Sequence, residues 1–343
     1  MSKVVTFGEI MLRLSTPGFE RFVQSKQFDV TFGGGEANVA ASLAQLGLDA
    51  YFLSKIPKHE VGQAAVNHLR RFGVSDRFIV RGGERLGIYF LETGASQRPS
   101  KVIYDRAGSS VSGLRADEID FDAVFEGATW FHWTGITPAL GPTARETLRA
   151  ALKAAREQGV TVSCDLNFRK KLWSPEEAQA TMRPLMEFVD VCIANEEDTQ
   201  LSLGVEAHEV DVETGSLSLE HYARIAQALK EQYEFKAVAI TLRESISASR
   251  NGWSAMMLDD RECSPAYRSS QYDIQLVDRV GGGDSFAAGL IYGLIRETDT
   301  RRALEIGVAA SALKQTIPGD FNICSITEVM ALVDGGGSGR IQR

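Results

Sequence analysis

Residues 281–290 read GGGDSFAAGL, so three glycines lead directly into a carboxylate at the start of an apolar, helix-like stretch. Glycines before a helix let successive N–H groups turn inward as an anion nest, and the helix start adds its dipole and unpaired N–H groups. Such a site suits phosphate oxygens. The acid, Asp284, would compete with a bound phosphate unless it faces a hydroxyl that attacks that phosphate. Phosphoryl transfer needs this combination: a base for the nucleophile and donors for the charge on the transferred group.

A structural interpretation of Asp284 also exists, because aspartate is a favoured N-cap residue. Other nucleotide motifs fit the chain less well. No GxxxxGK[ST] loop occurs, and neither GGGDSF nor GGGEAN has the third glycine of GxGxxG. The pattern therefore disfavours a dinucleotide oxidoreductase and favours phosphoryl transfer.

A second glycine run, residues 33–35, ends a strand-like segment and leads into the helical pattern GEANVAASLAQLG. Glycines there allow a ligand to approach the backbone closely. Asn38, one turn into the helix, offers a donor and an acceptor, which suits a hydroxyl-rich ligand. A tight strand–helix turn with a surface asparagine is an equally good interpretation. A third run, in the tail 335–343, has no apolar anchor, and we expect that tail to be flexible.

The segments that must position these motifs alternate between strand-like and helical patterns. Helices are expected over 37–47 and over 142–159, where Thr143 and Glu146 have capping-box spacing. Ser174, Pro175 and Glu177 repeat this start signal, with proline at the first helical position. This alternation is typical of βαβ units and predicts an α/β fold with a mostly parallel sheet covered on both faces. The expected strands are residues 4–7, 50–56, 130–133, 160–166, 190–195 and 237–242.

Two regions break the alternation. Residues 11–34 and 86–108 each contain two strand-like runs with no helix between them, so they look like hairpins of a small, separate β-sheet. In an α/β enzyme such a sheet often forms a lid or a dimer contact. An edge extension of the main sheet is the alternative.

Composition limits the protein class. The chain has 343 residues and a formal net charge of −8, which argues against a nucleic-acid partner. The four cysteines, Cys164, Cys192, Cys263 and Cys324, are scattered, as expected for buried free thiols of a cytoplasmic protein. No apolar run approaches the roughly 18 residues that a membrane span needs.

Two motifs together resemble a known family. VDRVGGGDSFAAG (277–289) resembles the C-terminal signature of the ribokinase-like (PfkB) sugar kinases, and FGGGEANVAASLAQLG (32–47) resembles their N-terminal signature. GEIMLRLSTPG (8–18) and IPGDFN (317–322) are similar to the 2-keto-3-deoxygluconate kinases, also called 2-dehydro-3-deoxygluconokinases. The resemblance covers about residues 3–334 and implies one ribokinase-like kinase domain over 1–334, with a small β-sheet lid.

The resemblance also implies an activity. A kinase of this subgroup transfers the γ-phosphate of ATP to the 6-hydroxyl of 2-keto-3-deoxygluconate and gives 2-keto-3-deoxy-6-phosphogluconate. It implies ATP and Mg²⁺, with a monovalent cation such as K⁺ as a further possibility. We expect a cytoplasmic enzyme that binds no nucleic acid or membrane and forms a homo-oligomer through the lid sheet.

The resemblance assigns roles to single residues by matching positions. Asp284 corresponds to the catalytic base, and its three preceding glycines correspond to the anion hole. Because this sugar is an acid, Arg106 and Arg169 could also bind its carboxylate with bidentate geometry. A solvated lid charge is the alternative for Arg106, and Tyr89 and Tyr104 could be ordinary strand aromatics. The implied sets are catalytic residues Gly281, Gly282, Gly283 and Asp284; substrate-binding residues Gly34, Asn38, Tyr89, Tyr104, Arg106, Ile136, Arg169, Asp284 and Asp320; nucleotide-binding residues Asn195, Thr241, Arg243, Gly281 and Gly283; and Asp198, through water, for the metal.

The chain departs from the family pattern at four places. Gly282 replaces the usual alanine, and Arg279 stands where threonine is common, which bears on any monovalent cation near that loop. Asp198 is one methylene shorter than the usual glutamate. The segment TLRESISASRNGW (241–253) lacks the glycines usual in the nucleotide-side turn after this strand.

Three other functions stay open on the sequence. A ribokinase-like kinase of a neutral sugar, such as fructose or ribose, would keep the same mechanism. A non-catalytic sugar or nucleotide sensor would bind without turnover, although it would not need a base such as Asp284. A nucleoside kinase would phosphorylate adenosine.

Overall fold

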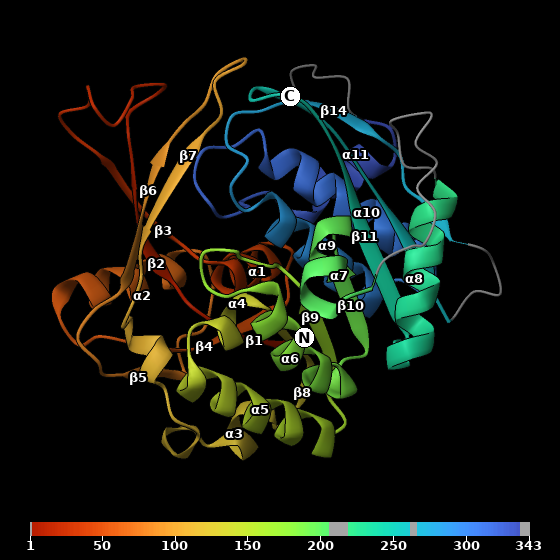
Figure 1. The fold of residues 1–343 in the computed structure, drawn as a ribbon, viewed down its shortest axis with the longest axis horizontal. Coiled ribbons are helices and arrows are strands. Elements are labelled where there is room, and N and C mark those ends of the chain that lie inside the picture. The colour runs from red at the N-terminus through yellow and green to blue at the C-terminus, as the bar shows by residue number, and fades with distance from the viewer. Residues whose placement is uncertain (1, 206–218, 261–265, 337–343) are drawn as a thin grey trace.

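The apolar runs expected to form strands all do so, in the main sheet. The computed structural model describes residues 2–205, 219–260 and 266–336, and in it the main sheet has ten strands (Figure 1). Pairing is parallel from β11 to β5, and β12 is antiparallel to its three partners, so the mostly parallel sheet is confirmed. The strand order is β13 (Tyr267–Arg268), β12 (Arg250–Asp259), β11 (Ala237–Ser247), β10 (Val191–Ala194), β9 (Thr161–Asp165), β8 (Ala128–Thr134), β1 (Lys3–Phe7), β4 (Asp49–Ile56) and β5 (Ile79–Arg81), with β14 (Tyr272–Gln275) paired to β12.

Helices cover both faces of this sheet and enclose two separate apolar cores. One core lies under α1 (Gly35–Gln45), α2 (Glu60–Arg71), α9 (Gly282–Arg296) and α10 (Thr300–Lys314). The other lies under α3 (Phe121–Phe125), α5 (Pro142–Glu157), α6 (Pro175–Leu185) and α8 (Leu219–Tyr233). The other α-helices of the described residues are α4 (Ile136–Ala139), α7 (Glu196–Leu203) and α11 (Ile326–Val333).

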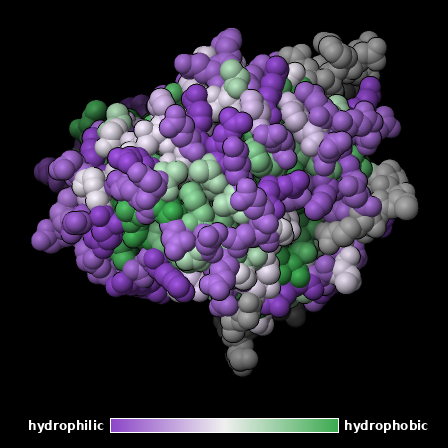
Figure 2. All heavy atoms as spheres, turned by 90° about the horizontal axis from the view of Figure 1, so that it is seen from below, coloured by the Kyte–Doolittle hydropathy of each residue, from purple (hydrophilic) through white to green (hydrophobic). Residues whose placement is uncertain are grey.

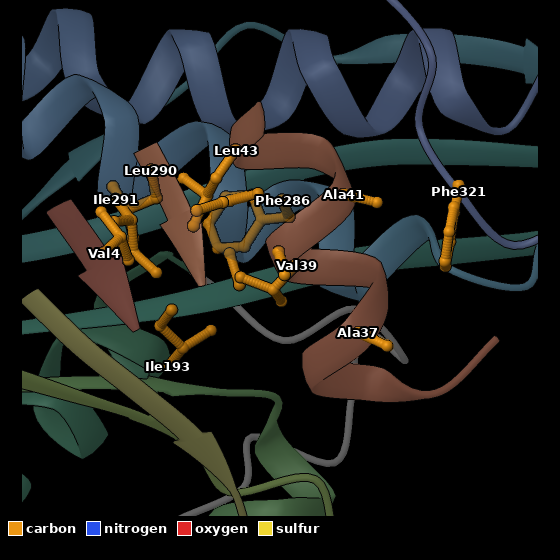
Figure 3. Close-up of a cluster of buried hydrophobic side chains, with 14 of the residues drawn as sticks. Val4, Ala37, Val39, Ala41, Leu43, Ile193, Phe286, Leu290, Ile291 and Phe321 are labelled. Atoms are coloured by element: carbon orange, nitrogen blue, oxygen red, sulfur yellow. The ribbon is translucent and has the colours of Figure 1, made fainter. Parts of the chain in front are cut away.

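The first core fixes where α9 begins. Phe286 and Leu290 of α9 are fully buried and pack beside Val39 and Leu43 of α1 (Figure 3). Burying each such side chain contributes about 1.5–3 kcal/mol. The two glycine-led helix starts are therefore held side by side by apolar packing.

The helix starts agree only partly with the sequence. The capping box at Ser174 and Glu177 is confirmed, with proline at the first helical position. The box expected at Thr143 and Glu146 is wrong, because α5 begins at Pro142 and Gly141 is its N-cap. Proline is well suited to the first helical position, which places Thr143 inside the helix, where its side chain cannot cap.

The predicted hairpins form a separate four-stranded sheet, which lies at the left of Figure 1. Its order is β3 (Asp29–Gly33), β2 (Met11–Ser15), β6 (Gly87–Glu92) and β7 (Lys101–Asp105). The two central strands are parallel and the outer pairs antiparallel. Alternation along β2 turns Met11 and Arg13 to the buried face. The alternative of an edge extension of the main sheet is therefore wrong.

Figure 2 shows a face on which hydrophilic residues predominate, with apolar groups between them. Within the described residues, no helix is long and apolar enough to cross a membrane. Cys164, Cys192 and Cys324 are free and buried, as expected. Cys263 and tail residues 337–343 lie outside the described residues.

Candidate active site

One pocket of about 510 Å³ collects the predicted site residues. It lies between the small sheet and the carboxyl ends of β9, β10 and β11, the usual ligand position in open α/β folds. Asn167, Glu197, Trp253 and Arg279 also line it, among residues that the sequence did not single out for the site. The predicted residues in its wall are Gly34, Asn38, Tyr89, Tyr104, Arg106, Ile136, Arg169, Asn195, Asp198, Thr241, Arg243, Gly281, Gly282, Gly283, Asp284 and Asp320.

The glycine run at 281–283 contributes to the helix as well as to the loop. Gly281 is the N-cap of α9, with φ +81°, and Gly282 and Gly283 form its first turn. Asp284 is thus the third residue of the helix, and its interpretation as an N-cap is wrong. The amides of Gly283 and Asp284 belong to the first turn, where helical N–H groups have no acceptor within the helix. They are available to an anion in the pocket.

Asp284 is joined to the other glycine-led helix by Asn38. The Asn38 Nδ2 donates to Asp284 Oδ2 at 2.6 Å, and its Oδ1 accepts from the Gly34 N–H at 3.1 Å. These two bonds fix which end of the amide faces the acid. Asn38 is buried, so the interpretation as a surface residue in a turn is wrong.

The surroundings of Asp284 suit a general base. It is half-buried at the pocket, and burial raises its pKa to about 6, against the opposing effects of the Asn38 hydrogen bond and the Arg169 charge. A base whose pKa lies close to neutral pH accepts a proton effectively and is still ionised in the cell.

The small sheet contributes two tyrosines from opposite positions on neighbouring strands. Tyr89 on β6 pairs with Tyr104 on β7, and their ring centroids are 6.0 Å apart. The Tyr89 hydroxyl donates to Asp320 Oδ2 at 2.5 Å, whereas Tyr104 keeps 37% of its surface exposed. Arg13 of β2 donates to Asp320 Oδ1 at 2.6 Å. Both oxygens of Asp320 are thereby fixed by residues of the small sheet.

Arg106 is not a solvated lid charge, because it is buried and forms an ion pair with Glu9. Its guanidinium also lies 5.5 Å from the centre of the Tyr104 ring. The interpretation as a solvated charge is therefore wrong. Glu9, which was not predicted, orients Arg106 from behind the pocket wall.

Three guanidiniums line the pocket without a carboxylate partner among the described residues: those of Arg169, Arg243 and Arg279. Burial, together with the charge of Arg243, lowers the pKa of Arg279. Neighbouring like charges are unfavourable without a counter-ion. This side of the pocket is therefore built to take an anionic ligand.

The acids near the ends of β9 and β10 fit a cation held through water. Asn195 caps α7, accepting from the Asp198 N–H at 2.8 Å, and its Nδ2 donates to Asp198 Oδ2 at 2.8 Å. Burial raises the pKa of Asp198 to about 6, and burial and the Asp198 charge raise that of Asp165 well above its usual value. A nearby cation would relieve this cost.

No three His, Cys, Asp or Glu side chains are grouped to ligate a metal directly within residues 2–205, 219–260 and 266–336. Mg²⁺ does not need such a group of direct ligands, because it keeps several waters and binds through one or two carboxylates plus phosphates. Asn195, Asp198 and Asp165 would hold the hydrated ion, and when bound it would neutralise phosphate charge.

Residues 241–253 form a β-hairpin, which accounts for the absence of the usual turn glycines. Instead of a glycine turn, β11 continues through Ser247 and forms a hairpin with β12. Near the tip, the Ala248 N–H donates to the Ser96 carbonyl at 2.8 Å, and the Ser96 N–H donates to Ser249 Oγ at 2.9 Å. The hairpin therefore contacts the loop between β6 and β7.

Several buried charged residues beside the site were not predicted from the sequence. Arg13, Asp278 and Lys314 form one group, and Glu36 accepts from the hydroxyls of Thr134 and Thr137. Burial raises the pKa of Glu36 to about 7. Alternation along β2 gave no signal for Arg13, because the apolar neighbours Leu12 and Leu14 lie on the other face of the strand and Arg13 lies on the buried one.

Comparison with known proteins identifies the family. The description "pfkB family carbohydrate kinase" matches residues 1–324. The chain belongs to the PfkB family of carbohydrate kinases. It is therefore a phosphotransferase with an alcohol group as acceptor, and the resemblance seen in its glycine motifs is confirmed.

Individual relatives are similar along nearly the whole chain. A 2-dehydro-3-deoxygalactonokinase of Haloferax volcanii is 35% identical over 98% of both chains. A 2-dehydro-3-deoxygluconokinase of Bacillus subtilis is 28% identical, over 95% of this chain and 94% of the relative. The crystal structure of a 2-dehydro-3-deoxygluconokinase from Thermotoga maritima is 54% identical with a TM-score of 0.92, covering 97% of this chain and 98% of that one. This PfkB kinase thus has the ribokinase-like fold.

Proposed function

We propose that this PfkB kinase transfers the γ-phosphate of ATP to the 6-hydroxyl of 2-keto-3-deoxygluconate, giving 2-keto-3-deoxy-6-phosphogluconate. The observation that carries the proposal is Asp284 at the N-terminus of α9, joined to Asn38 and in one pocket with three arginines that have no carboxylate partner among the described residues. The relatives named for 2-dehydro-3-deoxygluconate support the sugar acid as the substrate.

The geometry supports a direct transfer. Asp284 removes the proton from the 6-hydroxyl, whose oxygen attacks the γ-phosphorus. The bond from that phosphorus to the β,γ-bridging oxygen breaks, and ADP leaves. The first-turn amides of α9 stabilise charge on the transferred group, as an oxyanion hole does. Closure of the small sheet over the sugar would exclude water, a competing acceptor.

The sugar acid would lie against the small sheet. Tyr89, Tyr104 and Arg106 approach the pocket from this sheet, and Gly34, Asn38 and Ile136 approach from the body. Arg106 and Arg169 would bind its carboxylate, a group that ribose and fructose lack. A neutral-sugar kinase would have little use for these two cations.

ATP would occupy the opposite half of the pocket, with Thr241, Arg243, Gly281 and Gly283 toward its phosphates and Asn195 with Asp198 toward the hydrated Mg²⁺. A putative ribokinase II from E. coli has been crystallised with ATP and Mg²⁺, and its likeness to this chain, at 20% identity, is one of fold. ATP as the donor agrees with the cytoplasmic location expected from the sequence.

The test is Mg²⁺- and ATP-dependent phosphorylation of 2-keto-3-deoxygluconate beside fructose, ribose and adenosine. The expected result is strong preference for the sugar acid, a product phosphorylated at the 6-position by ³¹P NMR, and loss of turnover in Asp284→Asn. Turnover of a neutral sugar or of adenosine instead would refute 2-keto-3-deoxygluconate as the proposed substrate. ATP binding without turnover of any acceptor would favour the sensor.

A second candidate is the galactonate-derived epimer, because the Haloferax relative is named for it. The two sugar acids differ at one hydroxyl. Comparing kcat/KM for both in the same assay decides between them, and a higher value for the galactonate-derived acid would replace the first candidate.

We further propose that two copies associate through the outer face of the small sheet. That face carries Leu14, Val30, Phe90 and Ile103 in register, and Val30 and Ile103 are 64% and 52% exposed. An exposed apolar sheet face of this kind marks an interaction surface. Light scattering should give at least a dimer, and Val30→Lys should dissociate it; a monomer at working concentration would contradict the proposal.

A further inference from the structure

Lys314 is a fully buried lysine at the end of α10, with no exposed surface. Lysine is almost never fully buried unless it is paired. The phosphoryl-transfer mechanism does not use it, so its position requires another explanation.

The Lys314 ammonium lies within a group of buried charges beneath the glycine loop. Its Nζ donates to the carbonyl oxygen of Asp278 at 3.0 Å. The carboxylate of Asp278 accepts from Arg13 at 2.5 Å and from the Gly319 N–H at 3.0 Å. Arg13 also pairs with Asp320, so one guanidinium joins two carboxylates, and Lys314 binds the backbone of Asp278.

The end of α10 supports the whole glycine loop. The Ser311 hydroxyl donates to the Gly282 carbonyl at 2.7 Å, and the Gln315 carbonyl accepts from the Asp278 N–H at 3.2 Å. The carbonyls of Asp278 and Gly282 therefore point down into the protein. Since C=O and N–H point opposite ways across a trans peptide, the next N–H, that of Gly283, faces the pocket.

We propose that Lys314 is a positioning residue that acts as a built-in cation for the glycine loop, holding the loop from below and supplying the positive charge that a bound monovalent cation would otherwise supply. The inference rests on the proposed phosphoryl transfer at the start of α9. In this proposal Lys314 takes the place of the K⁺ that the resemblance left open. A K⁺ ion would bind the Asp278 carbonyl oxygen, which the ammonium already contacts.

Charge, and not only packing, is needed for this role. Burial lowers the pKa of Lys314, and the carboxylates of Asp278 and Asp320 act against that shift. Burial raises the pKa of Asp284, and the Asn38 hydrogen bond, the Arg169 charge and, to a smaller extent, the Lys314 charge lower it. The charge of the Lys314 ammonium therefore contributes to the electrostatics of Asp284 at the reacting end of the pocket.

The first experiment uses the wild-type enzyme with the acceptor that it phosphorylates fastest. The rate is measured with K⁺, Na⁺ or tetramethylammonium as the only monovalent cation. The proposal expects kcat to agree within about twofold among the three salts, because the cation is already present. Activation by K⁺ of about fivefold or more would overturn the proposal.

The second experiment removes the charge while keeping the length of the side chain. Lys314→Met is expected to lower kcat about 10- to 100-fold, less than the loss of a direct oxyanion donor, and methylammonium or K⁺ should restore part of it. Ser311→Ala is the matched control, since it removes a neutral support of the same loop, and its smaller loss should not respond to cations. Lys314→Met with wild-type kcat, or a loss that no cation restores, would refute the role.

Nucleotide binding separates this proposal from the proposed substrate. If the wild type phosphorylates none of the acceptors, the substrate proposal fails and calorimetry decides the role of Lys314. Lys314→Met should then weaken binding of ATP about tenfold more than binding of ADP, because the charge lies behind the site of the terminal phosphate. An equal effect on both nucleotides would overturn the proposal.

Discussion

Gly281→Ala tests whether the glycine loop is held by its backbone conformation. Gly281 has φ +81°, a left-handed conformation that costs a residue with a Cβ about 1–2 kcal/mol. Its new methyl would also lie 2.0 Å from the Asp320 carbonyl oxygen and 3.3 Å from Lys314 Cε. The first distance is impossible, so either the loop or the Asp320 segment must move.

The expected loss of stability follows from these two effects. The movement forced by overpacking costs roughly 1–3 kcal/mol. Together with the backbone cost, it should lower the free energy of unfolding by about 2–5 kcal/mol. For 343 residues, at about 2.1 cal/mol/K of unfolding entropy each, one kcal/mol corresponds to about 1.4 °C. The midpoint of thermal unfolding should fall by about 3–7 °C. A displacement near 1 Å at the reacting group would also lower kcat about 100-fold.

Gly283→Ala is the matched control, because a Cβ there meets nothing within 4 Å and the residue is helical. Alanine is better than glycine inside a helix by about 0.8–1 kcal/mol, so this variant should unfold at the same or a slightly higher temperature. Thermal unfolding and steady-state kinetics are measured on both variants. A Gly281→Ala protein with the stability and kcat of the wild type would refute the reasoning.

Three further predictions concern single side chains. Asp284→Asn should lower kcat about 10²–10⁴-fold, and wild-type kcat/KM should fall as pH drops through about 6, where the base becomes protonated. Because the pKa is raised, ionised Asp284 destabilises the fold above that pH, so Asp284→Asn should melt at a higher temperature than the wild type at pH 8 but not at pH 4. Equal melting temperatures at pH 8 would contradict this. Arg106→Met should raise KM for the sugar acid at least about tenfold without raising KM for ATP, and adding Glu9→Gln should recover stability but not KM, since breaking a buried pair leaves a costly lone charge. Arg243→Gln should raise KM for ATP only; an unchanged value would exclude Arg243 from the nucleotide site.

The sequence predicted what depends on short-range patterns. Alternation of apolar runs gave the parallel sheet, and the small sheet followed from paired strand-like runs with no helix between them. The glycine motifs predicted a site at two helix starts, and those starts meet at Asn38 and Asp284. These features are local in the chain, so residue type and spacing are enough to indicate them.

Helix boundaries were predicted less well because they depend on details of one or two residues. Asp284 looks like an N-cap when three glycines are taken as loop, but α9 begins two residues before it. In the same way Thr143 has the spacing of a capping box, yet Pro142 starts the helix. A glycine or proline can lie on either side of a helix start, and apolar packing of the whole helix decides which.

The sequence by itself determined the kind of protein: its layers, its two glycine-led helices and the acid that follows one of them. Only the tertiary structure decided which charges are buried and paired. Arg13 meets Asp320 across 307 positions, and Arg106 meets Glu9 across 97. No local pattern specifies such pairs, because they form where separate segments exclude water together. The raised pKa of Asp284 has the same origin, since it depends on burial and on neighbours from distant parts of the chain.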